Sequence, residues 1–224
     1  MAAHNNAFFP VHYASPKESQ MDYELACRHN QSNIARPIYL NQHEMYLEPS
    51  VWLSQSTVEP ETLAFDICDG LIYLDEYCNT HHNQLTPSRI LVTPNNRCKI
   101  FLTHKSYEPN CCMYSAPEQL LNKNKGTIKS DIWALAVIIA ERLLGTTLFT
   151  ETTPLELFTQ QLTLSGISED TIVQNTVSQV NMKSNIRQTF QVWPAWIPFF
   201  EHSFHIKPEH RASLRALGDL IPHL

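Results

Sequence analysis

The sequence predicts an α+β fold in which a small sheet precedes a mostly helical body. Short apolar runs at residues 36–40 and 44–47 flank a polar turn, and a second pair at residues 90–92 and 99–101 flanks a turn that contains Pro and Asn. Each pair is typical of a β-hairpin. Residues 130–144 are apolar on nearly every side, which indicates a buried central helix.

Apolar residues at helical spacing place the other helices. A first helix is expected over residues 17–29, and a second begins at Pro60, after which apolar residues recur every three or four positions. Ser130 is expected to cap the central helix and Gly145 to end it. Four more helical segments are expected, at residues 154–164, 168–180, 194–204 and 211–220.

Composition argues against several functional classes. The chain has 224 residues, of which 43% are hydrophobic, and this is enough for a core of its own. Its net charge of -6, with no cluster of Lys and Arg, argues against binding to nucleic acid. The first residues do not resemble a signal peptide, and no stretch approaches the roughly 20 apolar residues of a membrane helix. A cytoplasmic protein without membrane insertion is therefore expected.

No metal site is predicted from the cysteines and histidines. The six cysteines have no CxxC spacing, and none of the eleven histidines is paired with them at the spacing of a zinc site. Reduced thiols are expected. The acidic residues Asp66, Asp69 and Glu76 on and after the second helix are interpreted as solvated charges, with an acid/base pair as the alternative.

Five short motifs follow one another in an order that resembles the protein-kinase fold. Residues 70–74 (GLIYL) resemble the end of the kinase helix that carries GLxYLH, and residues 82–91 (HNQLTPSRIL) resemble the catalytic-loop run HRDLKPxNIL. Residues 114–118 (YSAPE), 130–133 (SDIW) and 207–211 (KPEHR) are similar to the YxAPE, SDVW and DPxxR elements. A single motif would be weak, but five in the right order are specific.

The resemblance implies a protein-kinase-like fold that consists mainly of the helical C-lobe, with a reduced N-lobe. Residues 1–16 are expected to form an irregular arm, residues 17–49 an N-lobe remnant with one helix and a short hairpin, and residues 50–224 the helical C-lobe. Residues 129–164 also resemble the kinase-like module of TBC-domain-containing kinase-like proteins, which implies a place in vesicle-trafficking or endosomal assemblies.

The positions that carry kinase chemistry are degenerate in this sequence. By resemblance, Gln84 replaces the catalytic Asp, Thr86 replaces the Lys that follows it, and Arg89 replaces the metal-binding Asn. Leu102 replaces the metal-binding Asp of the next motif, and the five glycines form no GxGxxG loop. A neutral amide cannot take the proton of a substrate hydroxyl, and a guanidinium repels magnesium. No phosphotransfer and no cofactor are therefore expected.

Four residues that match the kinase motifs are expected to have structural roles. The resemblance implies a buried ion pair between Glu118 and Arg211. It also implies that Asp131 holds the backbone of the catalytic-loop segment and that Trp133 packs inside the helical body.

These observations favour a catalytically inactive pseudokinase that serves as a scaffold or binds a protein partner. One alternative is a truncated kinase mimic that binds and regulates a true protein kinase. Another is an unorthodox ATP-dependent protein kinase, which the missing carboxylates argue against. The function and the partner are therefore hypotheses at the level of sequence.

The reduced N-lobe is expected to leave apolar surface uncovered on the first helix, at residues 21–26, and on both strands of the first hairpin. Leu25, Ile38 and Tyr46 are the predicted partner-binding residues on this face. The alternative is that the arm folds back, so that its apolar side chains cover the same surface.

Overall fold

Contacts divide the chain into two compact units. The computed structural model describes residues 8–104, 111–122, 126–151, 153–167 and 183–223. The first unit contains residues 1–80 and 85–108, and the second contains residues 81–84 and 109–224. The first division by contacts falls after Thr80. The predicted lobe boundary at residue 50 stays a prediction.

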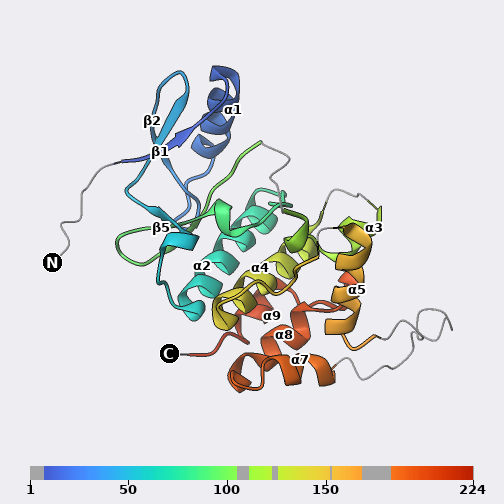
Figure 1. The fold of residues 1–224 in the computed structure, drawn as a ribbon. Helices are drawn as coiled ribbons and strands as arrows, with labels where there is room; N and C mark the ends of the chain where they lie inside the picture. The colour runs from blue at the N-terminus through green and yellow to red at the C-terminus, as the bar shows by residue number, and fades with distance from the viewer. Residues whose placement is uncertain (1–7, 105–110, 123–125, 152, 168–182, 224) are drawn as a thin grey trace. The chain divides into compact units, whose positions relative to one another are not determined.

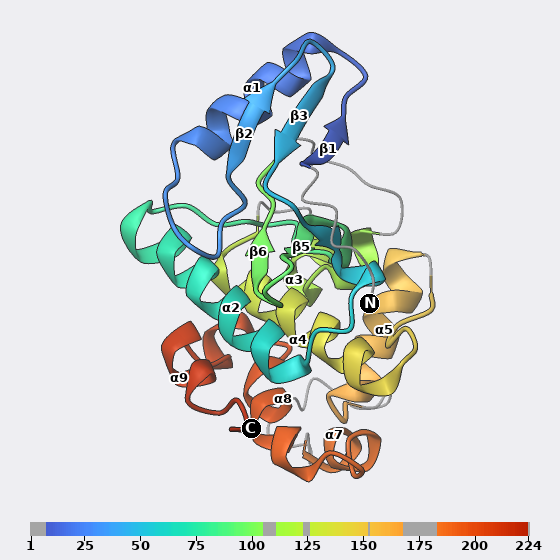
Figure 2. The same cartoon turned by 90° about the vertical axis from the view of Figure 1, so that its left-hand side faces the viewer.

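The first unit holds a three-stranded antiparallel sheet with strand order β1-β3-β2. Its strands are β1 (Phe9–His12), β2 (Pro37–Leu40) and β3 (Glu44–Leu47), and Figure 2 shows β3 between the other two. The β2–β3 pair confirms the first predicted hairpin. Because β3 is the central strand, β2 lies at one edge of this sheet.

The expectation of an irregular arm over residues 1–16 is wrong for β1. This strand pairs with β3 along its whole length, from Phe9 opposite Leu47 to His12 opposite Glu44. The physical reason lies in a period-two pattern that the sequence interpretation missed. Alternate residues of the arm are apolar, so an extended backbone gives it one apolar face.

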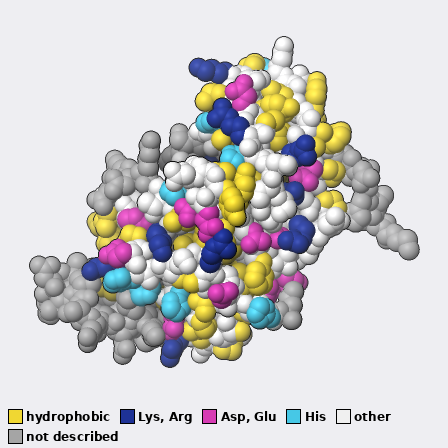
Figure 3. All heavy atoms as spheres, turned by 180° about the vertical axis from the view of Figure 1, so that it is seen from behind, with side chains coloured by type: hydrophobic (Ala, Val, Ile, Leu, Met, Phe, Trp, Pro, Cys, Tyr) yellow, Lys and Arg dark blue, Asp and Glu magenta, His cyan; other side chains and the backbone are white. Residues whose placement is uncertain are grey.

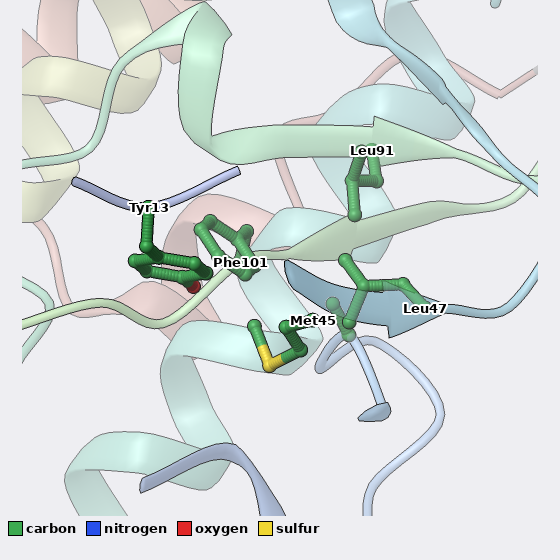
Figure 4. Packing of buried hydrophobic residues seen from close by; sticks show 6 residues of the cluster. Tyr13, Met45, Leu47, Leu91 and Phe101 are labelled. Atoms are coloured by element: carbon green, nitrogen blue, oxygen red, sulfur yellow. The ribbon is translucent and has the colours of Figure 1, made fainter. Parts of the chain in front are cut away.

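That apolar face belongs to the core of the first unit, which Figure 4 shows from close by. The buried cluster consists of Tyr13, Ala35, Met45, Leu47, Leu91 and Phe101, and Phe9 and Val11 of the arm pack against it. The prediction of uncovered apolar surface is therefore wrong for Met45 and Leu47, which have no exposed area. Ile38 and the adjacent Tyr39 on β2 do remain exposed.

Helix α1 (Pro16–Cys27) confirms the first predicted helix, but it begins one residue earlier and ends two residues earlier than predicted. Ser15 caps it by accepting a hydrogen bond from the backbone of Glu18. Its buried residues are Ser19, Asp22 and Ala26, whereas Met21 is exposed and Leu25 is half-buried. Polar Ser19 and Asp22 can face inward because each has a hydrogen-bond partner there.

The second sheet and helix α2 complete the first unit. Strands β4 (Val51–Trp52), β5 (Ile90–Val92) and β6 (Cys98–Ile100) form an antiparallel sheet in this order, and the β5–β6 pair confirms the second predicted hairpin. Helix α2 (Pro60–Ile72) packs along β6 and continues into a π-helical turn, Tyr73–Tyr77. A Cβ atom at Gly70 would lie 2.8 Å from Cδ1 of Ile100 and 3.1 Å from the backbone oxygen of Asn33, so any side chain there would force these neighbours to move.

The described part of the second unit is helical, and Figure 1 shows its helices gathered around α4. Its α-helices are α3 (Pro117–Asn122), α4 (Ile128–Leu144), α5 (Pro154–Leu164), α7 (Lys183–Thr189), α8 (Ile197–Ser203) and α9 (Leu214–Gly218). Short 3-10 helices in the chain are Leu53–Gln55, Pro87–Arg89, Cys111–Tyr114, Pro194–Trp196 and Pro208–His210. Together, the helices and two small sheets have the predicted α+β character.

Helix α4 confirms the predicted buried central helix and corrects its first residue. Residues 130–140 are all buried. The N-cap is Thr127 and not Ser130, because Ser130 is the third helical residue and its hydroxyl accepts from the Thr127 backbone in a capping box. Gly145 ends the helix with a left-handed backbone, φ 70°, as expected for a C-cap glycine.

The remaining helical predictions have mixed outcomes. Helix α5 matches its predicted range, and the predicted segment 168–180 lies outside the described residues. The predicted helix at 211–220 is shorter than expected, because Ser213 caps α9 by accepting from the backbone of Ala216. Among the described residues, no helix is both long and apolar enough to span a bilayer.

Candidate functional site

Arg211 and Glu118 form a bidentate ion pair in the second unit. Nη1 and Nη2 of Arg211 donate to the two carboxylate oxygens of Glu118 over 2.8 and 2.7 Å. The Arg211 side chain has no exposed area, and that of Glu118 is 20% exposed. A fully buried guanidinium needs an acceptor for each of its donors, and a parallel two-point contact with a carboxylate supplies two of them.

Backbone carbonyls from separate segments accept the other donors of Arg211. Its Nε donates to the carbonyl of His205 over 2.8 Å, and its Nη1 also donates to that of Lys129 over 2.7 Å. In return, Lys129 Nζ donates to the carbonyls of Arg211 and Ala212. The guanidinium therefore ties the start of α4 to the segment that precedes α9.

The Glu118 carboxylate is ionised because its partners outweigh its burial. Burial alone would raise the pKa of Glu118, but the hydrogen bonds and charge of Arg211 lower it, and the hydroxyl of Ser130 donates to the same carboxylate over 2.9 Å. The net result is a pKa below the ordinary value of 4.5. Since Ser130 also belongs to the capping box of α4, the ion pair is joined to that helix start.

Trp133 packs against the same guanidinium from α4. The Arg211 guanidinium carbon lies 5.1 Å from the centre of the Trp133 ring, which is a cation–π arrangement. Phe204 meets the ring edge-on at 5.0 Å, and Phe149 stacks on it at 6.4 Å. The structure thus brings three of the four predicted structural residues, Glu118, Arg211 and Trp133, into one cluster.

Asp131 holds the backbone of the segment 81–84, which also belongs to the second unit. Its two carboxylate oxygens accept from the backbone N–H groups of His82 and Asn83 over 2.8 and 2.7 Å. Gln119 donates to the carbonyl of Asn83, whose φ of 65° lies in the left-handed region. Asn tolerates this backbone better than most residues, and the carboxylate fixes it.

The four positions assigned to kinase chemistry are divided between the two units. Gln84 is half-buried in the second unit, whereas Thr86, Arg89 and Leu102 are buried in the first. The hydroxyl of Thr86 lies 2.8 Å from that of Ser88. A hydrogen bond from the Phe101 backbone to the Arg89 carbonyl aligns the segments that carry Arg89 and Leu102.

Two buried carboxylates in the first unit were missed by the sequence interpretation. Asp22 accepts from the backbone N–H of His104 over 2.6 Å and lies 3.1 Å from its Nδ1. Asp66, interpreted as a solvated charge, is buried and accepts from the Arg97 side chain and the Cys98 backbone. Asp66 falls three residues after buried Leu63 on α2, and this spacing could have placed it on the inner face.

No group of three or more His, Cys, Asp or Glu side chains capable of holding a metal ion occurs among the described residues. The described cysteines are not in disulfides. On the face shown in Figure 3, Lys and Arg side chains lie scattered among Asp and Glu side chains. That distribution lacks the continuous basic area that binding to a phosphate backbone needs.

Comparison with known proteins relates this chain to protein kinases. No protein-family model matches it. A mitogen-activated protein kinase of Caenorhabditis elegans, pmk-1, is 25% identical over 172 residues, which cover 68% of this chain and 45% of that protein. The fold is protein-kinase-like. The mitogen-activated protein kinase hog1 of Aspergillus niger is 30% identical over 127 residues, 53% of this chain and 34% of that protein.

A third relative is the dual specificity mitogen-activated protein kinase kinase sek-1 of Caenorhabditis elegans. It is 28% identical over 96 residues, which cover 38% of this chain and 29% of that protein. The kinase-like chain thus spans less than half the length of each of these relatives. Identity this low supports the fold and leaves the activity of the chain to its own residues.

We predict that Arg211→Ala destabilises the protein by about 3–5 kcal/mol, because it leaves the Glu118 carboxylate without its charge partner in a largely buried site. The matched control is Arg187→Ala. Arg187 also pairs with a glutamate, Glu201, over 2.8 Å, but 59% of the Arg187 side chain is exposed, so its loss should cost less than about 1 kcal/mol. Urea unfolding measures both changes, and equal losses would contradict the assignment of Arg211 as the buried anchor.

We also predict opposite acid responses for two glutamates of the second unit. Because the pKa of Glu118 is lowered, its stabilisation is present above pH 4.5 and is lost as the pH falls through the lowered pKa. Burial raises the pKa of Glu141 above 4.5 against its bonds to Tyr114 and the Leu148 backbone, so the contribution of Glu141 is lost as the pH rises.

The free energy of unfolding measured between pH 6 and pH 3 tests both signs. The loss of stability on acidification should be smaller in Glu118→Gln than in the unsubstituted protein. It should be larger in Glu141→Gln. If both variants change the acid limb in the same direction, the assigned pKa directions are wrong for one of the two groups.

Proposed function

We propose that this kinase-like chain is a pseudokinase, which transfers no phosphate and acts by binding another protein. The observation that carries the proposal is the set of side chains at the four chemical positions, Gln84, Thr86, Arg89 and Leu102. None of these side chains is a carboxylate. Phosphoryl transfer needs a carboxylate that orients the substrate hydroxyl and takes its proton, and acidic or amide oxygens that hold magnesium against the phosphates.

Arg89 gives the strongest support for the lack of activity. A guanidinium has only donors and keeps its positive charge at any physiological pH, so it cannot act as a metal ligand. Its side chain is also buried, with 3% of the residue exposed. A magnesium ion at this position would meet a charge of its own sign where little water is present to screen it.

Thr86 and Leu102 support the same conclusion from their own surroundings. The hydroxyl of Thr86 pairs locally with Ser88 and carries no charge that could neutralise a phosphate. Leu102 is apolar and 6% exposed, so nothing at that position can coordinate a metal. A neighbouring side chain could take over the role of one missing kinase residue. Activity here would require a separate replacement for each of the four.

The binding role is supported by the exposed apolar side chains of β2. Ile38 is 47% exposed and Tyr39 is 58% exposed, on an edge strand of the described sheet. Edge strands with apolar side chains are typical places for another chain to dock. The resemblance to TBC-domain-containing kinase-like proteins makes a trafficking assembly the first place to look for that chain, and a true kinase is the second.

We predict that Mg-ATP does not stabilise the protein against thermal unfolding. A ligand present at 100 times its Kd would add about 2.7 kcal/mol, which a melting curve resolves easily. An active mitogen-activated protein kinase treated in parallel is the positive control, and magnesium without nucleotide is the blank. A clear upward shift with Mg-ATP, or phosphate transfer to a generic protein substrate, would overturn the proposed lack of activity.

We predict that Ile38→Glu abolishes capture of the protein partner while the fold is unchanged. A charge on an exposed apolar site has little effect on folding but cannot be buried in an interface without a partner charge. Leu25 and Tyr46, the other predicted contacts, are half-buried, so charges there would also disturb the core. Ile38 therefore gives the clean measurement.

Val192→Glu is the matched control for Ile38→Glu. Val192 is 72% exposed, belongs to the other compact unit and has similar size and chemistry. Proteins captured from a native cell extract are quantified by mass spectrometry for the unsubstituted chain and both variants. The β2 face is rejected as the binding surface if the same proteins are captured at the same level with Ile38→Glu as with Val192→Glu.

A further inference from the structure

Cys78 and His29 form a thiol–imidazole pair in the first unit. Sγ of Cys78 lies 3.5 Å from Nδ1 of His29, within hydrogen-bond distance for sulfur. Cys78 immediately follows the π-helical turn Tyr73–Tyr77, and His29 follows helix α1, so the pair joins segments 49 residues apart. Both side chains are half-buried, which leaves part of the pair open to solvent.

The π-helical turn places Tyr73 beside the same sulfur. The backbone N–H of Cys78 donates to the carbonyl of Tyr73 over 3.3 Å, which is the five-residue hydrogen bond of a π turn. Interaction with the Cys78 side chain is the main cause that raises the pKa of Tyr73. The Tyr73 ring also meets the His29 ring edge-on at 5.8 Å.

His29 is suited to accept a proton. Burial, and then the charge of neighbouring Arg28, lowers its pKa from the ordinary 6.5, so the imidazole is neutral at pH 7. A neutral ring with its proton on Nε2 presents the lone pair of Nδ1 to the thiol. Tyr73 stays protonated and can donate to the sulfur once negative charge develops there.

We propose that Cys78 is a reactive thiol and a site of mixed-disulfide formation with small disulfides, with His29 as the base. The thiol proton moves to Nδ1 of His29 while Sγ attacks one sulfur of the incoming disulfide. A new S–S bond forms, the original S–S bond breaks, and the leaving thiolate takes up a proton from the imidazolium. The small disulfide is the oxidant, and no other reactant is needed.

The other cysteines of the described residues lack this combination. Cys68 and Cys98 are buried, and burial, together with the charge of Asp69, raises the pKa of Cys68 to about 12. Cys27 is exposed and interacts with Tyr23, whose pKa it raises, and none of its described contacts is to an imidazole. Cys27 is therefore an internal control, because it is exposed to the same reagent and has no described contact with an imidazole base.

The test is treatment of the whole chain with oxidised glutathione at pH 7, followed by mass spectrometry that resolves each cysteine. We expect Cys78 to be modified at least about tenfold faster than Cys27, a modest ratio beside the 10²–10⁴ that a positioned base contributes in enzymes. His29→Gln should bring the rate at Cys78 down to that at Cys27 and leave Cys27 unchanged. Tyr73→Phe should lower the ratio by a smaller factor.

A measurement on the unsubstituted chain keeps the proposal open to refutation if a variant fails to fold. A thiol without a base reacts through its thiolate, whose fraction falls about tenfold for each pH unit below pH 7. The rate at Cys78 instead follows the neutral form of His29, whose lowered pKa keeps that form populated further into acid, so the Cys78-to-Cys27 rate ratio should rise as the pH falls from 7 to 5. Circular dichroism identifies an unfolded variant, in which buried Cys68 and Cys98 would also react. A ratio near one at pH 7, or a ratio that does not rise as the pH falls, would overturn the proposal.

Discussion

Arg211 carries a full positive charge on a side chain without exposed area, and this constrains the second unit around it. A buried charge costs several kcal/mol unless ion-pair and hydrogen-bond partners compensate. Here the partners come from α3, from the first turn of α4 and from the segment just before Arg211, through Glu118, Lys129 and His205. None of the three segments can move away without leaving a donor or an acceptor unpaired, so the pair fixes their mutual arrangement. Trp133 covers one face of the guanidinium and keeps water out.

The need of buried charged groups for partners inside the protein applies to the residues that match the kinase motifs and not to those that replace the kinase's chemical groups. Glu118, Arg211 and Asp131 have their partners inside the protein, so their loss would destabilise the fold whether or not a substrate is bound. In a kinase, the groups matched by Gln84 and Arg89 act on substrate and metal, and they do not stabilise the fold. Under the proposed function, no phosphate transfer requires the kinase residue types at these two positions. Under the proposed function, the residues that stabilise the second unit match the kinase motifs, and the residues at the chemical positions do not.

Sequence patterns predicted elements well where one period was unbroken. Both hairpins and helix α4 follow directly from runs of apolar residues. Strand β1 was missed because its pattern extends over only four residues, and pairing with β3 supplies the order that local propensity does not. The N-cap of α4 was placed at Ser130 and not at Thr127, because Ser and Thr are both good N-cap residues. The hydrogen bond from Ser130 to Glu118, which sequence patterns do not show, belongs to a serine inside the first turn of the helix.

The candidate site was predictable to the extent that it depends on motif order. Motif order pairs Glu118 with Arg211, but it gives no indication of contacts specific to this chain. Asp22 with His104 and Cys78 with His29 join residues 82 and 49 positions apart, and neither pair has a spacing that marks it in the sequence. Contacts between isolated side chains of distant segments become visible only once the backbone has been placed.

The conformation of the segment 81–84 is held by main-chain hydrogen bonds and not by the side chain at position 84. Residues on both sides of it belong to the first unit, yet the segment itself belongs to the second. The backbone N–H groups of His82 and Asn83 donate to the carboxylate of Asp131. Asn83 has a left-handed backbone, and its carbonyl accepts a hydrogen bond from the side chain of Gln119. These bonds involve the main chain of the loop, so they do not depend on which side chain occupies position 84. The side chain at position 84 can therefore differ from the carboxylate of the kinase motif without releasing the loop.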